Sequence, residues 1–236
     1  VKNKSKYLIL KRKFKYKNIN VYNDFSKLNK IFIKGRADYT MSSITGLPGL
    51  EPTFKIIKHT KKIAIANKES IICAWNLIKK QLKTYKTDFI PVDSEHFSIW
   101  KLIEKEEKKN IKEIYLTASG GPFLKYKKSQ YKYIKPSNAI KHPKWEMGKK
   151  ISIDSATMMN KVFEVIEARR LFDIDYKNIN IFIHPESYLH SIVSFNNGVN
   201  KFLLHDTNMK IPIFNSIYSE EHKILKTNKL NLKVIN

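Results

Sequence analysis

The fold is decided by residues 61–92, which read KKIAIANKESIICAWNLIKKQLKTYKTDFIPV. The apolar run that ends at Asn67 predicts a buried strand. From about Glu69 to Tyr85, apolar side chains recur with a period near 3.6, which predicts an amphipathic helix. A second short apolar strand follows at 88–92. A strand, a long helix and another strand predict a βαβ unit with parallel strands, and therefore an α/β fold.

Further elements are expected on both sides of this unit. Before it, residues 19–22 and 30–34 are strand candidates. The segment 44–57 is punctuated by glycine and proline, which predicts a turn leading into a short helix. After the unit, the pattern predicts a helix at 97–109 and strands at 113–117, 178–184, 191–195 and 201–204, the last two joined by the Asn-Asn-Gly turn at 196–198.

The composition excludes several classes of protein. The chain has 236 residues, of which 42% are hydrophobic, so it can bury a core. No apolar run approaches the length of a membrane span, and the apolar patch at 7–10 is too short for a signal-peptide core, so we expect no membrane partner. The single cysteine excludes an internal disulfide and a cysteine-based zinc site. Its apolar helical surroundings predict that the Cys73 thiol is buried.

The net charge of +24 first suggests a polyanionic partner such as nucleic acid. The kind of basic residue argues against it, because phosphate and base recognition usually relies on the bidentate guanidinium of arginine. Of the 45 basic residues, only Arg12, Arg36, Arg169 and Arg170 are arginine, and the lysines are spread over almost every loop. We therefore expect no nucleic-acid partner.

Two carboxylates follow the strand at 88–92, in the residues Asp93 and Glu95. Ligands of open α/β sheets gather at the carboxyl ends of the strands. Residues two apart on an extended segment point to the same side, so both could reach one ion, with Glu164 arriving from a helix. Hard oxygen ligands without cysteine favour Mg²⁺ or Mn²⁺. Three unrelated surface acids are the alternative, and the spacing alone leaves both open.

A second group of polar residues lies in the segment 149–164, KKISIDSATMMNKVFE, which we expect to form the mouth and first turns of a helix that Asp154 or Ser155 caps. Side chains three and four residues apart share a face of that helix. A helix start and a Gly-Gly loop after the strand at 113–117 both expose backbone N–H groups, which favour a phosphate. The alternative is an ordinary cap and a solvated helix face. The expected phosphate ligands are Ser119, Ser155, Asn160 and Lys161.

Three further residues stand out by position. Lys68 follows a buried strand, where an ammonium group needs a charged partner unless it reaches solvent. The polar, lysine- and tyrosine-rich segment 124–144 resembles a mobile flap, and His142 lies near its end. His142 and His184 are the two histidines for which we expect ligand contact.

Six words of the sequence occur in a specific order: GLPGLEPT at 46–53, IAIANKES at 63–70, IPVDSEH at 90–96, SGGPF at 119–123, KHPKWEMGKKISIDSATMMNK at 141–161 with Glu164, and FIHPES at 182–187. In these words the chain resembles the 1-deoxy-D-xylulose 5-phosphate reductoisomerase family of the non-mevalonate isoprenoid pathway. The resemblance runs from about residue 40 to 215.

The resemblance implies an enzyme that binds Mn²⁺ or Mg²⁺ and NADPH. That enzyme isomerises a phosphorylated ketose and reduces the product to 2-C-methyl-D-erythritol 4-phosphate. It also implies the remnant of a Rossmann-like dinucleotide-binding domain at 1–92 and an α+β catalytic domain at 93–218, with a flap at about 120–148 and a tail at 219–236. A homodimer in the cytoplasm of a bacterium is expected, with a plastid-type organelle as the alternative.

The family's functional residues carry over onto the matching words. Metal ligands are expected at Asp93, Glu95 and Glu164, and catalytic roles at Lys68, Glu95 and His142. The substrate-binding residues implied are Lys68, Ser94, Glu95, Ser119, His142, Trp145, Ser155, Asn160, Lys161 and Glu164. The cofactor-binding residues implied are Asn67, Glu69, Met147 and Gly148.

The chain also departs from the family. No glycine precedes Gly35, so the glycine-rich dinucleotide loop is missing, and the family's C-terminal helical domain has no counterpart. Val162 replaces a glycine, and we expect its bulk beside the site. We interpret the chain as an internal fragment that binds metal and sugar phosphate better than NADPH and turns over little alone. The alternative is a degenerate, non-catalytic remnant that acts as a basic binding protein.

Overall fold

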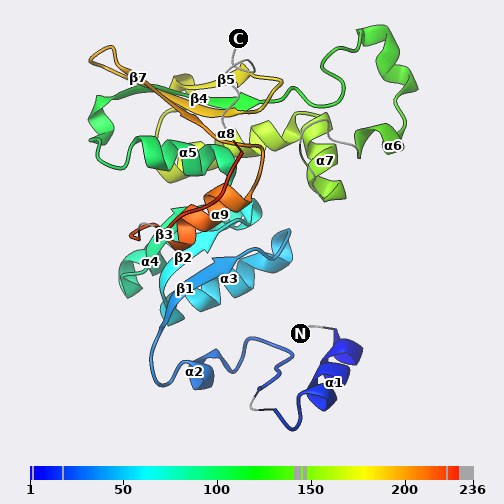
Figure 1. Cartoon of the computed structure of the whole chain (residues 1–236), viewed down its shortest axis with the longest axis vertical. Helices are drawn as coiled ribbons and strands as arrows, with labels where there is room; N and C mark the ends of the chain where they lie inside the picture. Colours follow the sequence, from blue (N-terminus) through cyan, green and yellow to red (C-terminus); the bar gives the residue numbers. More distant parts are fainter. Residues whose placement is uncertain (2, 18, 141–144, 146–147, 222, 229–236) are drawn as a thin grey trace.

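The computed structural model describes residues 1, 3–17, 19–140, 145, 148–221 and 223–228. Two sheets lie one above the other, each with helices packed on it (Figure 1). The mixed α/β fold with a Rossmann-like parallel part agrees with the prediction. None of the helices among these residues combines the length and the apolar character needed to cross a membrane.

The first sheet is parallel and has the order β1-β2-β3, formed by β1 (Ala37–Ser42), β2 (Thr60–Ile65) and β3 (Asp88–Pro91). The helix α4 (Lys68–Tyr85) connects β2 to β3, which confirms the βαβ unit. Its apolar stripe packs on the sheet with Ile57, Ile63, Ile65, Ile71, Trp75, Ile78 and Leu82 as the buried core. Removing these side chains from water is what holds the helix on the sheet.

Local signals set both ends of α4. The side chain of Asn67 caps the helix by accepting a hydrogen bond of 2.7 Å from the N–H of Ser70. At the other end Lys86 adopts a left-handed conformation with φ of 50°, which turns the chain toward β3. The short α3 (Leu50–Ile56) precedes this unit, flanked by the 3₁₀ turns η1 (Leu47–Gly49) and η2 (Ile57–His59).

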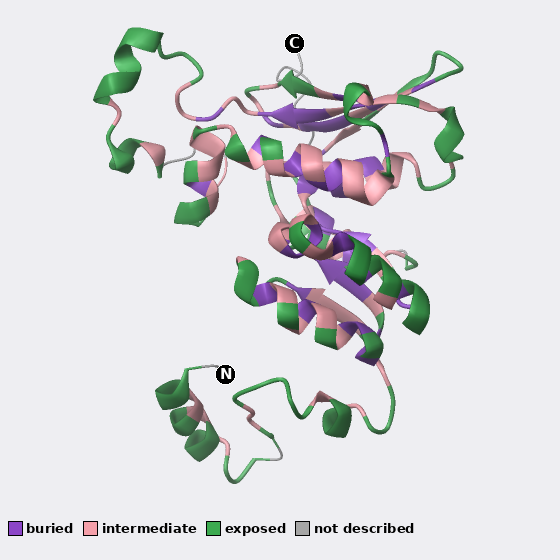
Figure 2. Cartoon of the chain, turned by 180° about the vertical axis from the view of Figure 1, so that it is seen from behind, coloured by how far each residue is buried: buried purple, intermediate pink, exposed green. Residues whose placement is uncertain are grey.

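The second sheet has the order β5-β4-β6-β7. Its strands are β4 (Ile111–Ala118), β5 (Ile179–Ile183), β6 (Leu189–Phe195) and β7 (Asn200–Leu204). The β6 and β7 strands form the expected antiparallel hairpin, whereas β4 and β5 are parallel. The helices α5 (Ser94–Leu102) and α8 (Met159–Phe172) pack against one face of this sheet (Figure 2). They contribute Ile99 and Ala168 to its core.

The segment between β4 and α8 projects to one side of the second sheet (Figure 1). It contains η4 (Lys128–Tyr133), α6 (Pro136–Ala139) and α7 (Lys149–Ala156). The remaining short elements are η3 (Lys108–Asn110), η5 (Tyr176–Asn178) and α9 (Lys210–Ile217). The helix α9 returns to the first sheet, where the hydroxyl groups of Tyr39 and Ser216 lie 2.8 Å apart.

The N-terminal segment lies apart from both sheets (Figures 1 and 2). The helix α1 (Lys4–Lys13) has no buried residue, and α2 (Leu28–Ile31) is a single short turn. Two sequence predictions were wrong here, because neither 19–22 nor 30–34 is a strand. A strand needs a neighbour with which to pair, and among the described residues no strand pairs with the outer edge of β1.

Three other local predictions were wrong. The helix expected at 97–109 begins earlier, at Ser94, and ends at Leu102. The helix expected to start at a cap on Asp154 or Ser155 starts only at Met159, and residues 149–156 form a separate helix, α7, because Met158 adopts a left-handed conformation with φ of 59°. Cys73 lies on the outward face of α4 and is exposed, so its thiol is not part of the core.

Candidate active site

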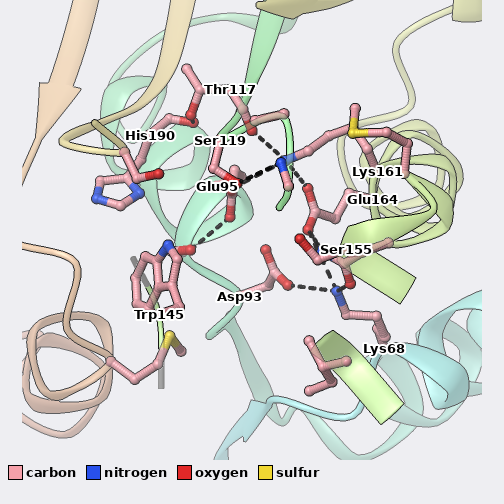
Figure 3. Close-up of a pocket in the computed structure, with 18 of the residues that line it drawn as sticks. Lys68, Asp93, Glu95, Thr117, Ser119, Trp145, Ser155, Lys161, Glu164 and His190 are labelled. Carbon is pink, nitrogen blue, oxygen red and sulfur yellow. Dashed lines mark hydrogen bonds and ion pairs between the residues drawn. The ribbon is translucent and has the colours of Figure 1, made fainter. Parts of the chain in front are cut away.

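A cavity of about 330 Å³ lies where the carboxyl ends of β2, β3 and β4 meet α7 and α8 (Figure 3). The segments after these strands provide Lys68, Asp93 and Ser119, and α8 provides Asn160 and Glu164. This position at the carboxyl ends of parallel strands is typical of ligand sites in α/β proteins. Its volume suits a small molecule.

Three carboxylates meet on one side of the cavity. The carboxylate oxygens of Asp93, Glu95 and Glu164 lie within 4.8 Å of one another. Asp93 is the residue before α5 and Glu95 lies in its first turn, so the extended segment expected for this pair was wrong. The turn of the helix, and not strand alternation, brings the two side chains to the same place. Glu164 reaches them from α8.

Two lysines, Lys68 with an 11% exposed side chain and the buried Lys161, neutralise these carboxylates (Figure 3). The Lys68 Nζ atom lies 3.1 Å from Asp93 Oδ2 and 3.6 Å from Glu164 Oε1. The Lys161 Nζ atom lies 3.2 Å from Glu95 Oε1, contacts Glu164, and donates a hydrogen bond to the carbonyl oxygen of Thr117. Lys68 thus has the charged partners that its burial requires.

The proximity of these groups shifts their pKa values in opposite directions. Burial opposes ionisation of Asp93, but the Lys68 ammonium outweighs it and holds the pKa of Asp93 well below its usual range. Burial and the nearby Glu164 carboxylate raise the pKa of Glu95 to about 7. Burial lowers the pKa of Lys161, but the carboxylates of Glu164 and Glu95 outweigh that effect and raise it overall. Neighbouring groups with pKa values pushed apart are typical of functional sites.

The residues predicted to bind phosphate all line this cavity, but not in the expected arrangement. Ser155 lies near the C-terminal end of α7, so it does not cap a helix start. The Asn160 side chain accepts a hydrogen bond of 2.7 Å from Lys68 and donates one to Glu164. Ser119 and Gly121 lie on the loop after β4, where the Gly121 N–H donates to the Ser119 hydroxyl over 3.2 Å.

Trp145 and His190 form another part of the wall. Their ring centroids lie 6.0 Å apart in an edge-to-face arrangement, and His190 stacks on His205 at 3.6 Å. Burial lowers the pKa of His190 to about 3, so its ring is neutral at ordinary pH. His184, for which ligand contact is predicted from the sequence, is not among the residues that line the cavity.

Two family models of one enzyme match this chain. The family model described as 1-deoxy-D-xylulose 5-phosphate reductoisomerase matches residues 1–75, and the model of the C-terminal domain of the same enzyme matches residues 89–172. The chain belongs to the 1-deoxy-D-xylulose 5-phosphate reductoisomerase family. The match begins at residue 1, further toward the N-terminus than the words that carry the resemblance.

Curated members of the reductoisomerase family align with nearly the whole chain. The enzyme of Pelagibacter ubique is 58% identical over 231 residues, which is 98% of this chain and 60% of that protein. The enzyme of Clostridium tetani is 44% identical over 216 residues, which is 92% of this chain and 56% of that protein. The chain thus spans about 60% of the length of these relatives.

Solved structures of reductoisomerases share the fold. The enzyme of Zymomonas mobilis in complex with NADPH has a TM-score of 0.88 and 32% identity, and the match covers 100% of this chain and 60% of that one. A second reductoisomerase, in complex with NADPH, fosmidomycin and magnesium, has a TM-score of 0.83 and 35% identity. That match covers 94% of this chain and 57% of the other.

Three of the cofactor residues that the reductoisomerase family implies, Asn67, Glu69 and Gly148, lie in or beside the cavity. The Asn67 amide donates hydrogen bonds of 2.5 Å and 2.9 Å to the carbonyl oxygens of Ile44 and Gly46. Glu69 pairs with Lys150 at 3.0 Å, and Gly148 lines the cavity. Cofactor contact at these positions stays a prediction. The predicted residues His142 and Met147 lie outside the described part of the chain.

At two further positions of the reductoisomerase motifs, Val162 and Ser94, the structure differs from the prediction or adds to it. Val162 is 46% exposed and is not among the residues that line the cavity, so the expected crowding of the site was wrong. Ser94 is buried and donates a hydrogen bond of 2.6 Å to Glu95 Oε2, which orients that carboxylate. The side chain of Ser94 therefore acts on the predicted metal ligand as well as lining the cavity.

A substitution of Gly121 tests how the loop after β4 supports this cavity. Gly121 has φ of 70°, and a Cβ atom there would lie 2.8 Å from the carbonyl oxygen of Ser155. We expect Gly121→Ala to lower the free energy of unfolding by about 1–3 kcal/mol, because it adds a clash to backbone strain. Urea denaturation measures the loss.

The matched control is Gly198→Ala. Gly198 has φ of 86°, and a Cβ atom there would have no neighbouring atom within 4 Å, so this variant carries the strain without the clash. A loss in Gly121→Ala no larger than that in Gly198→Ala would contradict the close approach of the loop to α7.

Proposed function

We propose that this chain carries the metal- and substrate-binding site of a reductoisomerase that converts 1-deoxy-D-xylulose 5-phosphate to 2-C-methyl-D-erythritol 4-phosphate. The observation that supports this most strongly is the convergence of Asp93, Glu95 and Glu164 within 4.8 Å, in a cavity that four polar side chains of the family's phosphate site also line. Neither a surface cluster nor a structural ion pair accounts for both features together.

The three carboxylates suit a divalent cation. They offer hard oxygen ligands, and no cysteine or histidine belongs to this group of three, which favours Mg²⁺ or Mn²⁺. A solved relative contains magnesium together with NADPH and fosmidomycin. When bound, such a cation would act as a Lewis acid that polarises the ketone and hydroxyl oxygens of the sugar.

The protein side chains orient the sugar phosphate. Lys68, which lies between Asp93 and Glu164, is the residue nearest to the sugar oxygens in this proposal. Lys161 is the phosphate ligand, together with Ser119, Ser155 and Asn160. Contact of Lys161 with phosphate requires that its ammonium group leave Glu95 and Glu164.

In this proposal Lys68 and Lys161 also stabilise the site in the absence of ligands. They hold the acidic cluster together before the ligands arrive, and the departure of Lys161 leaves the carboxylate oxygens available. Trp145 and His142, the two residues proposed to act from the flap, then cover the substrate. Exclusion of water by such a flap strengthens the electrostatic interactions in the cavity and protects the intermediate.

The proposed cofactor is NADPH, which supplies the hydride that reduces the aldehyde. Asn67, Glu69, Met147 and Gly148 are the residues proposed to face it. In this assignment residues 1–92 belong to the NADPH-binding domain, 93–218 to the catalytic domain with a flap at about 120–148, and 219–236 to a tail. The cytoplasm of a bacterium is the proposed compartment.

The face of the second sheet opposite its core is proposed to bind a second copy of the chain. The paired residues Tyr115, Ile192 and Phe202 form an apolar row across β4, β6 and β7, on the face opposite Ile114 and Val193 of the core. Phe202 is 54% exposed. An apolar row with a side chain as exposed as Phe202 favours association.

Replacing Phe202 by lysine tests this homodimer. We expect Phe202→Lys to be a monomer in analytical ultracentrifugation at concentrations where the unaltered chain is a dimer, because two buried ammonium groups would oppose contact. The control Ile33→Lys makes the same change at a side chain that is 80% exposed and far from the sheet. A monomeric unaltered chain, or a dimer that survives Phe202→Lys, would argue against this face.

The function is tested by calorimetric titration of 1-deoxy-D-xylulose 5-phosphate into the chain with and without Mn²⁺, followed by an assay of NADPH oxidation. Saturable binding that needs Mn²⁺ is expected, with little NADPH oxidation by a chain that spans about 60% of the length of its relatives. Absence of binding under both conditions would favour the non-catalytic remnant. NADPH oxidation at the rate of full-length relatives would overturn the expectation of low turnover.

A further inference from the structure

His96 is a buried ionisable residue that has no role in the site described so far. It lies on α5, one turn after Asp93, and its side chain is 0% exposed. It does not line the cavity, so it lies behind the carboxylates and not among the groups that face a ligand. A fully buried imidazole needs partners for both ring nitrogens.

The two ring nitrogens of His96 face two different residues of the proposed metal site, Asp93 and Glu164. Its Nδ1 atom lies 3.2 Å from Asp93 Oδ1, and its Nε2 atom lies 2.9 Å from the backbone carbonyl oxygen of Glu164. Because a carbonyl oxygen only accepts, Nε2 must carry a proton and donate it. The imidazole therefore connects the residue after β3 to the helix α8, which carries the third carboxylate.

Two neighbours fix the orientation of the His96 ring. Glu167 lies on α8 one turn after Glu164, its side chain is 2% exposed, and its Oε2 atom is 3.6 Å from His96 Nδ1. The ring of Phe172 stacks on the imidazole with centroids 6.2 Å apart and an angle of 16° between the planes. The carboxylate favours a proton on Nδ1, which then donates to Asp93.

We propose that His96, supported by Glu167, is a positioning residue that holds the Asp93 carboxylate and the backbone of Glu164 in place for the divalent cation. This inference rests on the proposed function, because it assumes that Asp93 and Glu164 are metal ligands. Groups that bind the ligands of a metal without touching it commonly change metal affinity 10–100-fold when replaced. Here one such group acts on two ligand residues from different elements.

The test compares Mn²⁺ affinity, measured from the electron paramagnetic resonance signal of free Mn²⁺, in His96→Gln and His96→Asn. The asparagine amide can take the place of Nδ1 and donate to Asp93, whereas the glutamine amide can take the place of Nε2 and donate to the Glu164 carbonyl. We expect His96→Gln to weaken Mn²⁺ binding about 10–100-fold and His96→Asn to retain most of the affinity. Glu167→Gln should weaken it by less than His96→Gln.

A control separates positioning from loss of stability. His59 is buried at the opposite end of β2, with 9% exposure, so His59→Gln reports what loss of a buried histidine does away from the carboxylates. Melting temperatures of all variants are measured without metal. The inference requires that affinity fall in His96→Gln and not in His59→Gln, even where the two melting temperatures fall equally.

Each outcome decides between the two proposals. Equal Mn²⁺ affinity in His96→Gln and the unaltered chain would overturn the positioning role and leave the proposed function intact. A second equivalent of tightly bound Mn²⁺, lost in His96→Gln and in Glu167→Gln, would show that Asp93, His96 and Glu167 bind a cation of their own and would also overturn it. No Mn²⁺ binding by the unaltered chain would overturn the proposed function, and this inference with it.

Discussion

Lys161→Met is expected to lower the free energy of unfolding of the metal-free chain by about 3–5 kcal/mol, since removing one partner of a buried ion pair leaves uncompensated charge. The Lys161 side chain is 6% exposed and contacts Glu95 and Glu164, whose side chains are 15% and 2% exposed. Methionine keeps most of the volume of lysine but supplies no charge. Urea denaturation without metal measures the loss.

Mn²⁺ makes this prediction specific to the proposed site. A divalent cation can replace the missing ammonium group, so Mn²⁺ should restore more stability to Lys161→Met than it adds to the unaltered chain. The control Lys55→Met removes a surface ion pair with Glu51 and should change stability by less than about 1 kcal/mol. A loss in Lys161→Met as small as that of the control would contradict the neutralising role of Lys161.

Glu164→Gln is expected to weaken Mn²⁺ binding at least about 100-fold, the upper end of what replacing even an outer-shell group costs. Glu164 is the one carboxylate of the three that contacts both lysines, and its side chain is 2% exposed. The amide keeps the shape of the side chain but removes the negative charge that a cation needs. Titration with Mn²⁺, followed by electron paramagnetic resonance, measures the change.

The control for this charge change is Glu51→Gln. Glu51 lies on α3, and its side chain is 73% exposed, so its replacement removes the same charge far from the cavity. We expect Mn²⁺ affinity within about threefold of the unaltered chain for this variant. If Glu164→Gln also stayed within about threefold, Glu164 would not be a metal ligand.

Patterns within single elements were enough to predict much of the fold. The apolar run at 61–67, the helical period from about 69 to 85 and the short run at 88–92 predicted the βαβ unit, and the turn at 196–198 predicted the β6–β7 hairpin. These elements depend on the burial of one face, which the sequence records directly. The motif words likewise identified the three carboxylates that the fold brings together.

Features that depend on distant contacts or on special backbone conformations were not predicted. The break between α7 and α8 depends on the left-handed backbone conformation of Met158, and nothing in the residue type indicates this conformation. His96 and His190 acquire their surroundings only when α5, α8 and β6 pack together. The spacing of His96 three residues after Asp93, and of Glu167 three after Glu164, was the signal available for the second group of buried charges.

The most direct test of the central claim is a crystal structure of the chain soaked with Mn²⁺, in which the anomalous scattering of manganese locates the ion. The proposed function predicts one strong peak within about 2 Å of oxygen atoms of Asp93, Glu95 and Glu164, with the Lys161 ammonium displaced from the carboxylates. A peak at another position, or no peak while Lys68 and Lys161 keep their ion pairs, would contradict it.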